Sequence, residues 1–284
     1  MDFVNLNEVL KPAIKGKFAI GAFNFYDMET VQAVVETAEE EKSPVILITG
    51  PMEVPLLGME GMLRAARHAI EKAKVPVCVH LDHYTDPDSV IAFIKAGYPS
   101  VMIDVSKLPF EENIRATKRV VDEAHKRGVT VEGELGRIGM VDGSVEESSE
   151  NPEATDPDKA LEFVERTKVD ALAINIGNAH GIYKVEPKLN FELLEKVAKI
   201  VPVPLVMHGG SSTPLADLKK VITLGMRKVN VATEMHVAFS KVMNEDLKNG
   251  SGFTWVSMSL MKVKEAQKSL VRQWIKNLGS SGSV

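Results

Sequence analysis

One stretch of the sequence decides the fold, namely Val75-Pro76-Val77-Cys78-Val79-His80-Leu81-Asp82-His83. Its first five residues are apolar, as is typical of a buried strand in a parallel sheet. Three ionisable side chains follow within four positions, although burying a charge is costly unless it is paired or bound to a metal. The alternative is a surface turn with satisfied polar groups. The rest of the chain favours a strand that presents chemistry at its carboxyl end.

Apolar runs of this kind recur along the chain, and helical stretches with apolar residues at three- and four-residue spacing separate them. The eight runs are residues 18–24, 44–50, 76–83, 100–105, 129–136, 171–177, 204–210 and 228–234. Helices are expected at 28–41, 59–74, 86–96, 110–127, 158–167, 191–200 and 214–224, with others at about 6–15 and 255–278. This alternation predicts an α/β protein, a (β/α)₈ TIM barrel with an N-terminal helix and extra C-terminal helices.

A doubly wound open sheet is the alternative that shares this alternation. Such a sheet usually carries a glycine-rich turn after its first strand, and the sequence there reads Gly21-Ala22-Phe23-Asn24-Phe25. A length of 284 residues suits one barrel, so we expect residues 1–284 to form a single domain.

Composition excludes several classes of protein. The net charge is −5 with acidic and basic residues interspersed, which argues against nucleic-acid and membrane partners. The one cysteine, Cys78, cannot form an internal disulfide, which favours a reducing compartment. No signal peptide is recognisable, and no apolar run reaches the roughly 18 residues of a transmembrane helix. We therefore expect a cytoplasmic protein.

Polar residues collect at the carboxyl ends of the expected strands, which meet at one rim of a barrel. They are Asn24, Asp82, His83, Asp104, Glu132, Glu134, Asn178, His180, His208 and Asn230. A single histidine in such a place is more often a hydrogen-bonded structural residue. Three at one rim, His83, His180 and His208, indicate a divalent metal. Imidazole favours zinc and its transition-metal neighbours, and three protein ligands leave a position for substrate.

Two further stretches point to an anionic substrate. The seventh strand ends in His208-Gly209-Gly210-Ser211-Ser212-Thr213-Pro214, and the eighth in Asn230-Val231-Ala232-Thr233. The loops after strands seven and eight are the usual phosphate site of this barrel, because small residues expose backbone N–H groups there. The alternative is that the glycines only permit a tight turn. A metal beside a phosphate site suggests a sugar phosphate.

Several separate motifs, in their order along the chain, resemble the class II metal-dependent ketose-bisphosphate aldolases. They are His80-Leu81-Asp82-His83, Val101-Met102-Ile103-Asp104, Leu108-Pro109-Phe110-Glu111-Glu112-Asn113, Glu132-Gly133-Glu134-Leu135-Gly136, Ala179-His180-Gly181-Ile182-Tyr183, His208-Gly209-Gly210-Ser211 and Lys228-Val229-Asn230-Val231-Ala232-Thr233-Glu234. The resemblance extends from the first strand to Gly279-Ser280-Ser281-Gly282. The sequence of residues 230–234 is more similar to the tagatose-bisphosphate branch of the family than to the fructose-bisphosphate branch.

The resemblance implies reversible cleavage of a ketohexose 1,6-bisphosphate, tagatose or fructose, to dihydroxyacetone phosphate and glyceraldehyde 3-phosphate. It implies that His83, His180 and His208 hold Zn²⁺, that Glu134 and Asp104 hold a displaced or second metal, and that Asp82 exchanges the proton of the C4 oxygen. The implied substrate-binding residues are Asn24, Gly181, Gly209, Gly210, Ser211, Asn230, Val231, Ala232 and Thr233. A monovalent cation, Na⁺ or K⁺, is implied near the Gly181 and Gly209 carbonyls, and a homodimer or homotetramer is expected.

The sequence departs from the family in a long segment, 137–157, that we expect to be a mobile lid. Where the family usually has Gly-Gly-x-Glu-Asp, this chain reads Gly139-Met140-Val141-Asp142-Gly143, so Asp142 is the direct match to the catalytic glutamate. Glu146 or Glu147 is the alternative. Thr49-Gly50-Pro51 offers no clear match to the family's serine or threonine. Val105 stands where a glycine or alanine is usual in the family, and Ser212 stands where the phosphate loop usually has a glycine. These changes leave open a different ketose phosphate.

Two other functions compete with this reading. A class I aldolase would form a Schiff base on a lysine, such as Lys184 or Lys228, but it would not explain three histidines at one rim. A non-catalytic sugar-phosphate-binding relative would explain the altered lid. The presence of Asp82 favours an enzyme.

Overall fold

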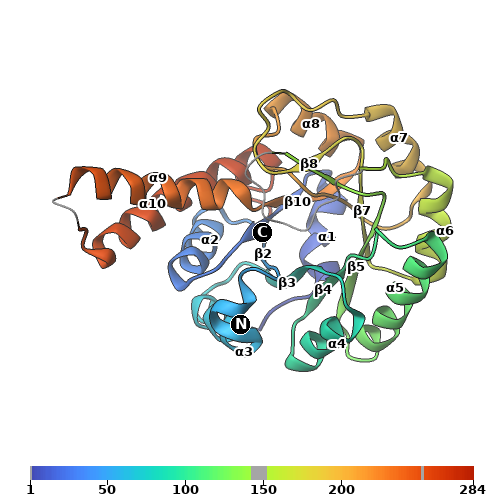
Figure 1. Ribbon diagram of the computed structural model, residues 1–284, viewed down its shortest axis with the longest axis horizontal. Coiled ribbons are helices and arrows are strands. Elements are labelled where there is room, and N and C mark those ends of the chain that lie inside the picture. Colours follow the sequence, from blue (N-terminus) through green and yellow to red (C-terminus); the bar gives the residue numbers. More distant parts are fainter. Residues whose placement is uncertain (1, 142–151, 251–252) are drawn as a thin grey trace.

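The strands form a closed barrel in the computed structural model, which describes residues 2–141, 152–250 and 253–284. In these ranges eight parallel strands pair in the order β1-β10-β9-β7-β5-β4-β3-β2 (Figure 1). They are β1 Ile20–Asn24, β2 Val45–Thr49, β3 Val77–Tyr84, β4 Ser100–Ile103, β5 Thr130–Leu135, β7 Ala171–Ile174, β9 Leu205–Met207 and β10 Met226–Val231. The predicted (β/α)₈ barrel is confirmed, and the open sheet is excluded because β1 pairs with β10.

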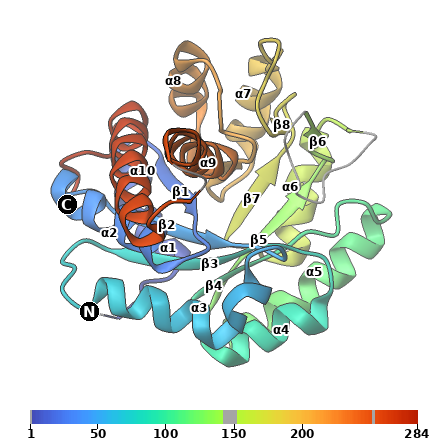
Figure 2. The ribbon, with the colours of Figure 1, turned by 60° about the vertical axis from the view of Figure 1, so that its left-hand side comes forward.

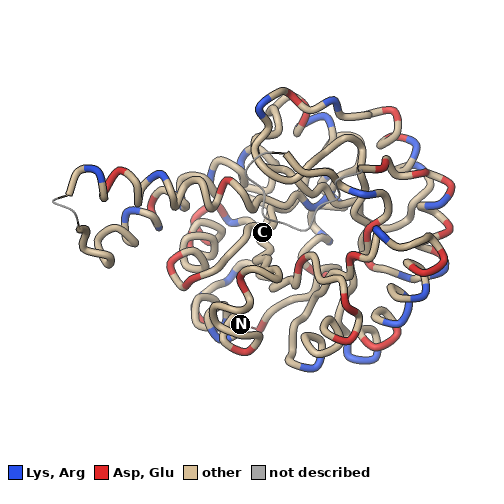
Figure 3. The backbone as a smooth tube through the Cα atoms, in the orientation of Figure 1, with Lys and Arg blue, Asp and Glu red and all other residues tan. Residues whose placement is uncertain are grey.

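A ring of helices covers the outside of the barrel. They are α2 Met28–Glu41, α3 Val54–Ile70, α4 Pro87–Ala96, α5 Phe110–His125, α6 Pro157–Thr167, α7 Phe191–Ile200 and α8 Leu215–Leu224. Asp27, Asp86 and Asp156 begin α2, α4 and α6 by accepting hydrogen bonds from first-turn N–H groups. The inner faces of the helices join the outward side chains of the strands in one core. Acidic and basic residues are mixed over the outer helices (Figure 3).

The N-terminal helix α1, Leu6–Gly16, closes the amino end of the barrel. A capping box between Asn5 and Glu8 begins the helix. Leu6, Val9, Leu10 and Ala13 are buried against inward-facing strand residues such as Ile46 and Cys78. The apolar layer of the interior therefore lies at the amino end, which leaves the carboxyl end for polar side chains.

Two C-terminal helices, α9 Thr233–Asn249 and α10 Val256–Leu278, project together from the barrel as a hairpin (Figure 1). No range was expected for α9, and the eighth strand was expected to continue to residue 234. It ends at Val231 because the helix begins at Thr233. Helix α10 lies along α2 (Figure 2), where Lys264 and Lys268 both pair with Glu36.

A small parallel pair, β6 Gly139–Met140 and β8 Ala179–His180, lies outside the barrel sheet. It corrects the expectation of one continuous loop over 137–157, because β6 and a bridge between Arg137 and Glu153 fall within that segment. Helix α3 also begins earlier than expected and bends at Gly58, where φ is +71°. None of the described helices is both long and apolar enough to cross a membrane.

Shortening single side chains of α1 tests whether its buried face stabilises the amino end of the barrel. Leu10 is fully buried and Ile14, one turn further along the same helix, is 49% exposed. We expect Leu10→Ala to lower the free energy of unfolding by about 2–5 kcal/mol. Ile14→Ala should change it by only ~0.5 kcal/mol. Urea denaturation followed by circular dichroism measures both, and equal losses would contradict this role for α1.

Candidate metal centre and anion pocket

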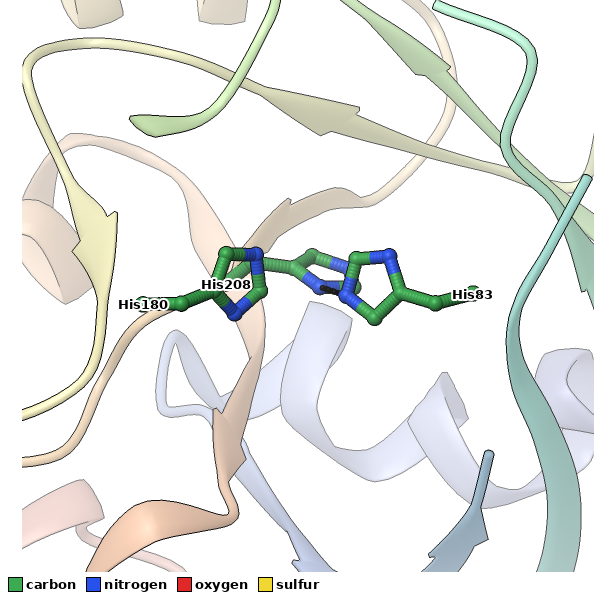
Figure 4. A group of neighbouring side chains, drawn as sticks. All are labelled: His83, His180 and His208. Carbon is green, nitrogen blue, oxygen red and sulfur yellow. Dashed lines mark hydrogen bonds between the residues drawn. The ribbon is translucent and has the colours of Figure 1, made fainter. Parts of the chain in front are cut away.

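Three buried imidazoles converge at the carboxyl end of the barrel. His83 lies near the end of β3, His180 in β8 and His208 directly after β9, and their rings turn toward one another (Figure 4). One ligand nitrogen from each lies within 4.8 Å of the other two. The closest pair is His83 Nε2 and His208 Nδ1, 2.8 Å apart. The structure therefore brings together the three histidines that the sequence singled out.

An unusual backbone conformation allows adjacent residues of β3 to serve one site. Successive side chains of a regular strand point to opposite faces of the sheet. His83 has φ = +50°, in the left-handed region that non-glycine residues rarely adopt, and the pairing of β3 with β4 shifts register between Leu81 and Tyr84. This break in the strand places both Asp82 and His83 at the inner rim. Backbone strain of this kind clusters at functional sites.

Asp82 is held beside the imidazoles by a residue of β10. The Asn230 side-chain amide donates to both carboxylate oxygens, at 3.2 and 3.1 Å, and lies 3.3 Å from His208 Nδ1. Asp82 Oδ2 is 4.0 Å from His83 Nε2. Asp82 is 5% exposed, so this carboxylate is placed for proton transfer in a nearly dry pocket.

Two buried carboxylates, Asp104 and Glu134, lie on the side of His83 that faces away from His208. Asp104 Oδ2 is 3.4 Å from His83 Nδ1, and Ser106 donates hydrogen bonds to both carboxylates. Burial, reinforced by the charge of Asp104, raises the pKa of Glu134 well above its ordinary range. Burial also opposes ionisation of Asp104, but the interactions with His83, together with the hydrogen bonds from Ser106, outweigh it and lower the pKa of Asp104 to about 2.

The donors fit a divalent metal. Two ring nitrogens that face each other at 2.8 Å cannot both carry a proton, so a cation or a shared proton must satisfy them. Three buried imidazoles form a donor set typical of zinc. His83, Asp104 and Glu134 form a second group whose ligand atoms also lie within 4.8 Å of one another. A displaced or second ion would bind there.

A small pocket beside the imidazoles has the character of an anion site. It is lined by Asp82, His180, Gly181, Gly209, Ser211, Asn230, Ala232 and Thr233. Helix α9 begins at this pocket, and its N-cap residue, Ala232, provides no side-chain hydrogen bond to the first turn. The N–H groups of a helix start favour negative charge. One end of the pocket therefore suits an anion, and Asp82 and His180 line the other end.

Most of the residues predicted to bind substrate line this pocket, and three do not. The backbone N–H of Gly210 donates a hydrogen bond to the carbonyl of Asn230, and the Val231 side chain is buried in the core. Asn24 is 5% exposed at the end of β1, and its buried Oδ1 finds no hydrogen-bond partner among the described residues. Asp142, Glu146 and Glu147 lie outside the described residues.

The sequence did not predict a network of hydrogen bonds that links the loops around the anion pocket. Ser212 has φ = +58°; its hydroxyl accepts from Tyr183 N at 2.9 Å, and its own N–H donates to Glu234 at 2.6 Å. The other oxygen of Glu234 accepts from Trp274 Nε1 in α10 at 2.6 Å. The hydroxyl that cross-links two loops explains why a serine occupies a position suited to glycine. Its departure from the family pattern was the only signal in the sequence.

Comparison with known proteins agrees with this geometry. The family described as fructose-bisphosphate aldolase class-II matches residues 4–283. The sulfofructosephosphate aldolase of Alkalicoccus urumqiensis is 40% identical over 284 residues, which cover 100% of this chain and 99% of the relative. The D-tagatose-1,6-bisphosphate aldolase subunit GatY of Klebsiella oxytoca is 38% identical over the full length of both chains. The YdjI aldolase of Escherichia coli K12 superimposes with a TM-score of 0.86 at 35% identity and covers 99% of both chains.

A methyl group at Gly209 tests how closely the pocket is packed. A Cβ there would lie 2.0 Å from the backbone oxygen of Ala179, and φ is +63°. A Cβ at Gly58, where φ is +71°, would meet no atom of the other described residues within 4 Å. Gly58 has ψ = 166°, a backbone conformation that is essentially restricted to glycine, so Gly58→Ala reports backbone strain without a close contact, about 1–3 kcal/mol. We expect Gly209→Ala to lower the melting temperature clearly further. Thermal unfolding of the two variants makes the comparison, and similar losses would mean that the loop yields freely.

Proposed function

Because this chain belongs to the class II fructose-bisphosphate aldolase family, whose members are lyases, we propose that it reversibly cleaves a ketohexose 1,6-bisphosphate. The substrate is tagatose or fructose 1,6-bisphosphate, and the products are dihydroxyacetone phosphate and glyceraldehyde 3-phosphate. The observation that carries this proposal is the convergence of three buried imidazoles beside Asp82 and an anion pocket. A different ketose phosphate is the second candidate, which the sulfofructosephosphate aldolase relative favours.

The proposed site uses a metal that the chain's imidazoles would hold. His83, His180 and His208 would bind zinc, and Asp104 and Glu134 would hold a second or displaced ion together with His83. A divalent ion bound there supplies a Lewis acid that stabilises the negative charge developing on the oxygen atoms of the substrate. A sodium or potassium ion near Gly181 and Gly209 remains part of the proposal.

The chain's own residues would carry the proton and hold the substrate. Asp82 accepts the proton of the C4 hydroxyl while the C3–C4 bond breaks, and the bonding electrons move toward the C2 carbonyl. Asn230 keeps the Asp82 carboxylate oriented through its two hydrogen bonds. The C1 phosphate would bind at Gly209, Ser211 and the start of α9, which line the pocket. Asp142, with Glu146 or Glu147 as the alternative, remains the prediction for the proton at C3.

Removal of the metal is the first test of this proposal. The purified enzyme should release triose phosphates from tagatose or fructose 1,6-bisphosphate, as detected with a coupled dehydrogenase. EDTA should abolish this cleavage and added zinc should restore it. Borohydride with substrate should leave the enzyme active, because no Schiff base forms. Inactivation by borohydride together with resistance to EDTA would contradict the proposal. If sulfofructose phosphate alone were cleaved, the second candidate would be correct.

Replacement of Asp82 separates proton transfer from metal binding. We expect Asp82→Ala to lower kcat by roughly 10²–10⁴-fold, the usual contribution of a general acid or base. Its zinc content, measured by atomic absorption, should stay close to wild type because Asp82 is not among the three converging imidazoles. Near-normal turnover in this variant would remove Asp82 from the mechanism. Loss of zinc would instead make Asp82 a ligand.

A further inference from the structure

We infer that Glu132 and Lys228, which lie buried beside His208 inside the barrel, are positioning residues that fix His208 with its Nδ1 toward the metal centre. The inference rests on the proposed function in that it concerns the same centre. It gives a role to two buried charged side chains that take no part in the proposed reaction. Both have a relative exposure of 0%.

The two ring nitrogens of His208 contact different groups and therefore differ in protonation. Nε2 lies 2.8 Å from Glu132 Oε1, and Nδ1 lies 2.8 Å from His83 Nε2. A carboxylate oxygen only accepts hydrogen bonds, so Nε2 must carry the proton that it donates to Glu132. The lone pair of the neutral ring is then on Nδ1, which faces His83. Glu132 thereby selects the tautomer and the ring orientation that a metal at the centre requires.

Lys228 supplies the charge that makes a buried Glu132 tolerable. An unpaired carboxylate in a protein interior carries a large desolvation cost. Lys228 Nζ lies 2.8 Å from Glu132 Oε2, so the ammonium group compensates the carboxylate within the barrel. His80 Nε2 is 3.6 Å from the same oxygen, and its other nitrogen lies 2.7 Å from Ser100 Oγ. Burial lowers the pKa of His80 well below its usual range, which leaves Lys228 as the cation of this group.

Two other uses of these residues are weaker. His80, Asp82 and Glu132 are close enough to hold a metal of their own, but the Lys228 ammonium group already lies against Glu132 and would repel a divalent ion. Lys228 could be a Schiff-base nucleophile, but it is fully buried and paired with Glu132. A positioning role accounts for the burial, the pairing and the hydrogen bond to His208 together.

A merely structural ion pair is the remaining alternative, and metal affinity distinguishes it. Replacing a buried ion pair by apolar residues is often neutral for stability, so stability alone does not decide. Loss of a carboxylate that orients a metal-bound histidine typically weakens metal binding about 10–100-fold. The affinity for zinc therefore reports the positioning role directly.

The experiment measures zinc affinity by competition with a chromogenic chelator, using the full chain without sugar. We expect Glu132→Gln and Lys228→Met each to weaken zinc binding ~10–100-fold, with Lys228→Arg retaining more affinity than Lys228→Met. Asp82→Ala serves as the matched control, since it removes a carboxylate of the same pocket and should keep its zinc. If a single variant does not fold, the double variant Glu132→Leu with Lys228→Met removes both charges and provides the same readout.

A second readout follows the ring itself. With ¹⁵N-labelled histidine, the metal-free wild-type protein should show His208 protonated at Nε2. The folded double variant Glu132→Leu with Lys228→Met has no hydrogen-bond acceptor at position 132 and should lose this preference. Unchanged zinc affinity and an unchanged tautomer in the folded variants would overturn the inference while leaving aldol cleavage intact. If cleavage of ketose bisphosphates were absent but zinc binding weakened as expected, the proposed function would fail and the inference would stand.

Discussion

Closure of a parallel sheet is the constraint on which the site depends. Because all eight described barrel strands run in the same direction, their carboxyl ends meet at one rim, and residues far apart in the sequence become neighbours. The pairing of β1 with β10 completes the ring and brings Asn230 against Asp82. The apolar residues of α1 fill the opposite end. The interior is thereby divided into an apolar half that stabilises the fold and a polar half that carries chemistry.

The polar half contains charges that can be buried only because they compensate one another. The Lys228 ammonium group pairs with Glu132, which in turn holds His208. Asp104 contacts the other side of the centre at His83. The two nitrogens of His208 face Glu132 and His83, and Nδ1 of His83 faces Asp104, so charged groups orient these two rings. An arrangement of this kind suits the metal centre proposed for these histidines, because it orients the rings before substrate arrives.

The anion end of the pocket is held by a different kind of interaction. Here the loop after β9 is cross-linked by hydrogen bonds from Ser212 to Tyr183 and Glu234. Trp274 carries the connection into α10, a helix that packs along α2 on the outside of the barrel. The C-terminal hairpin therefore contributes to the pocket from a distance. This gives the projecting helices a structural role beside the small pocket.

The sequence by itself determined the barrel, its eight strands, the N-terminal helix and the gathering of the three histidines at one rim. These follow from local apolar periodicity and from the rule that parallel strands present their carboxyl ends together. Only the tertiary structure decided that β10 ends before α9, that His83 adopts a left-handed conformation, and that Ser212 and Lys228 have buried polar partners. Such features depend on contacts between residues distant in the chain. A local pattern carries no record of which partner will neutralise a buried charge or stabilise a strained backbone.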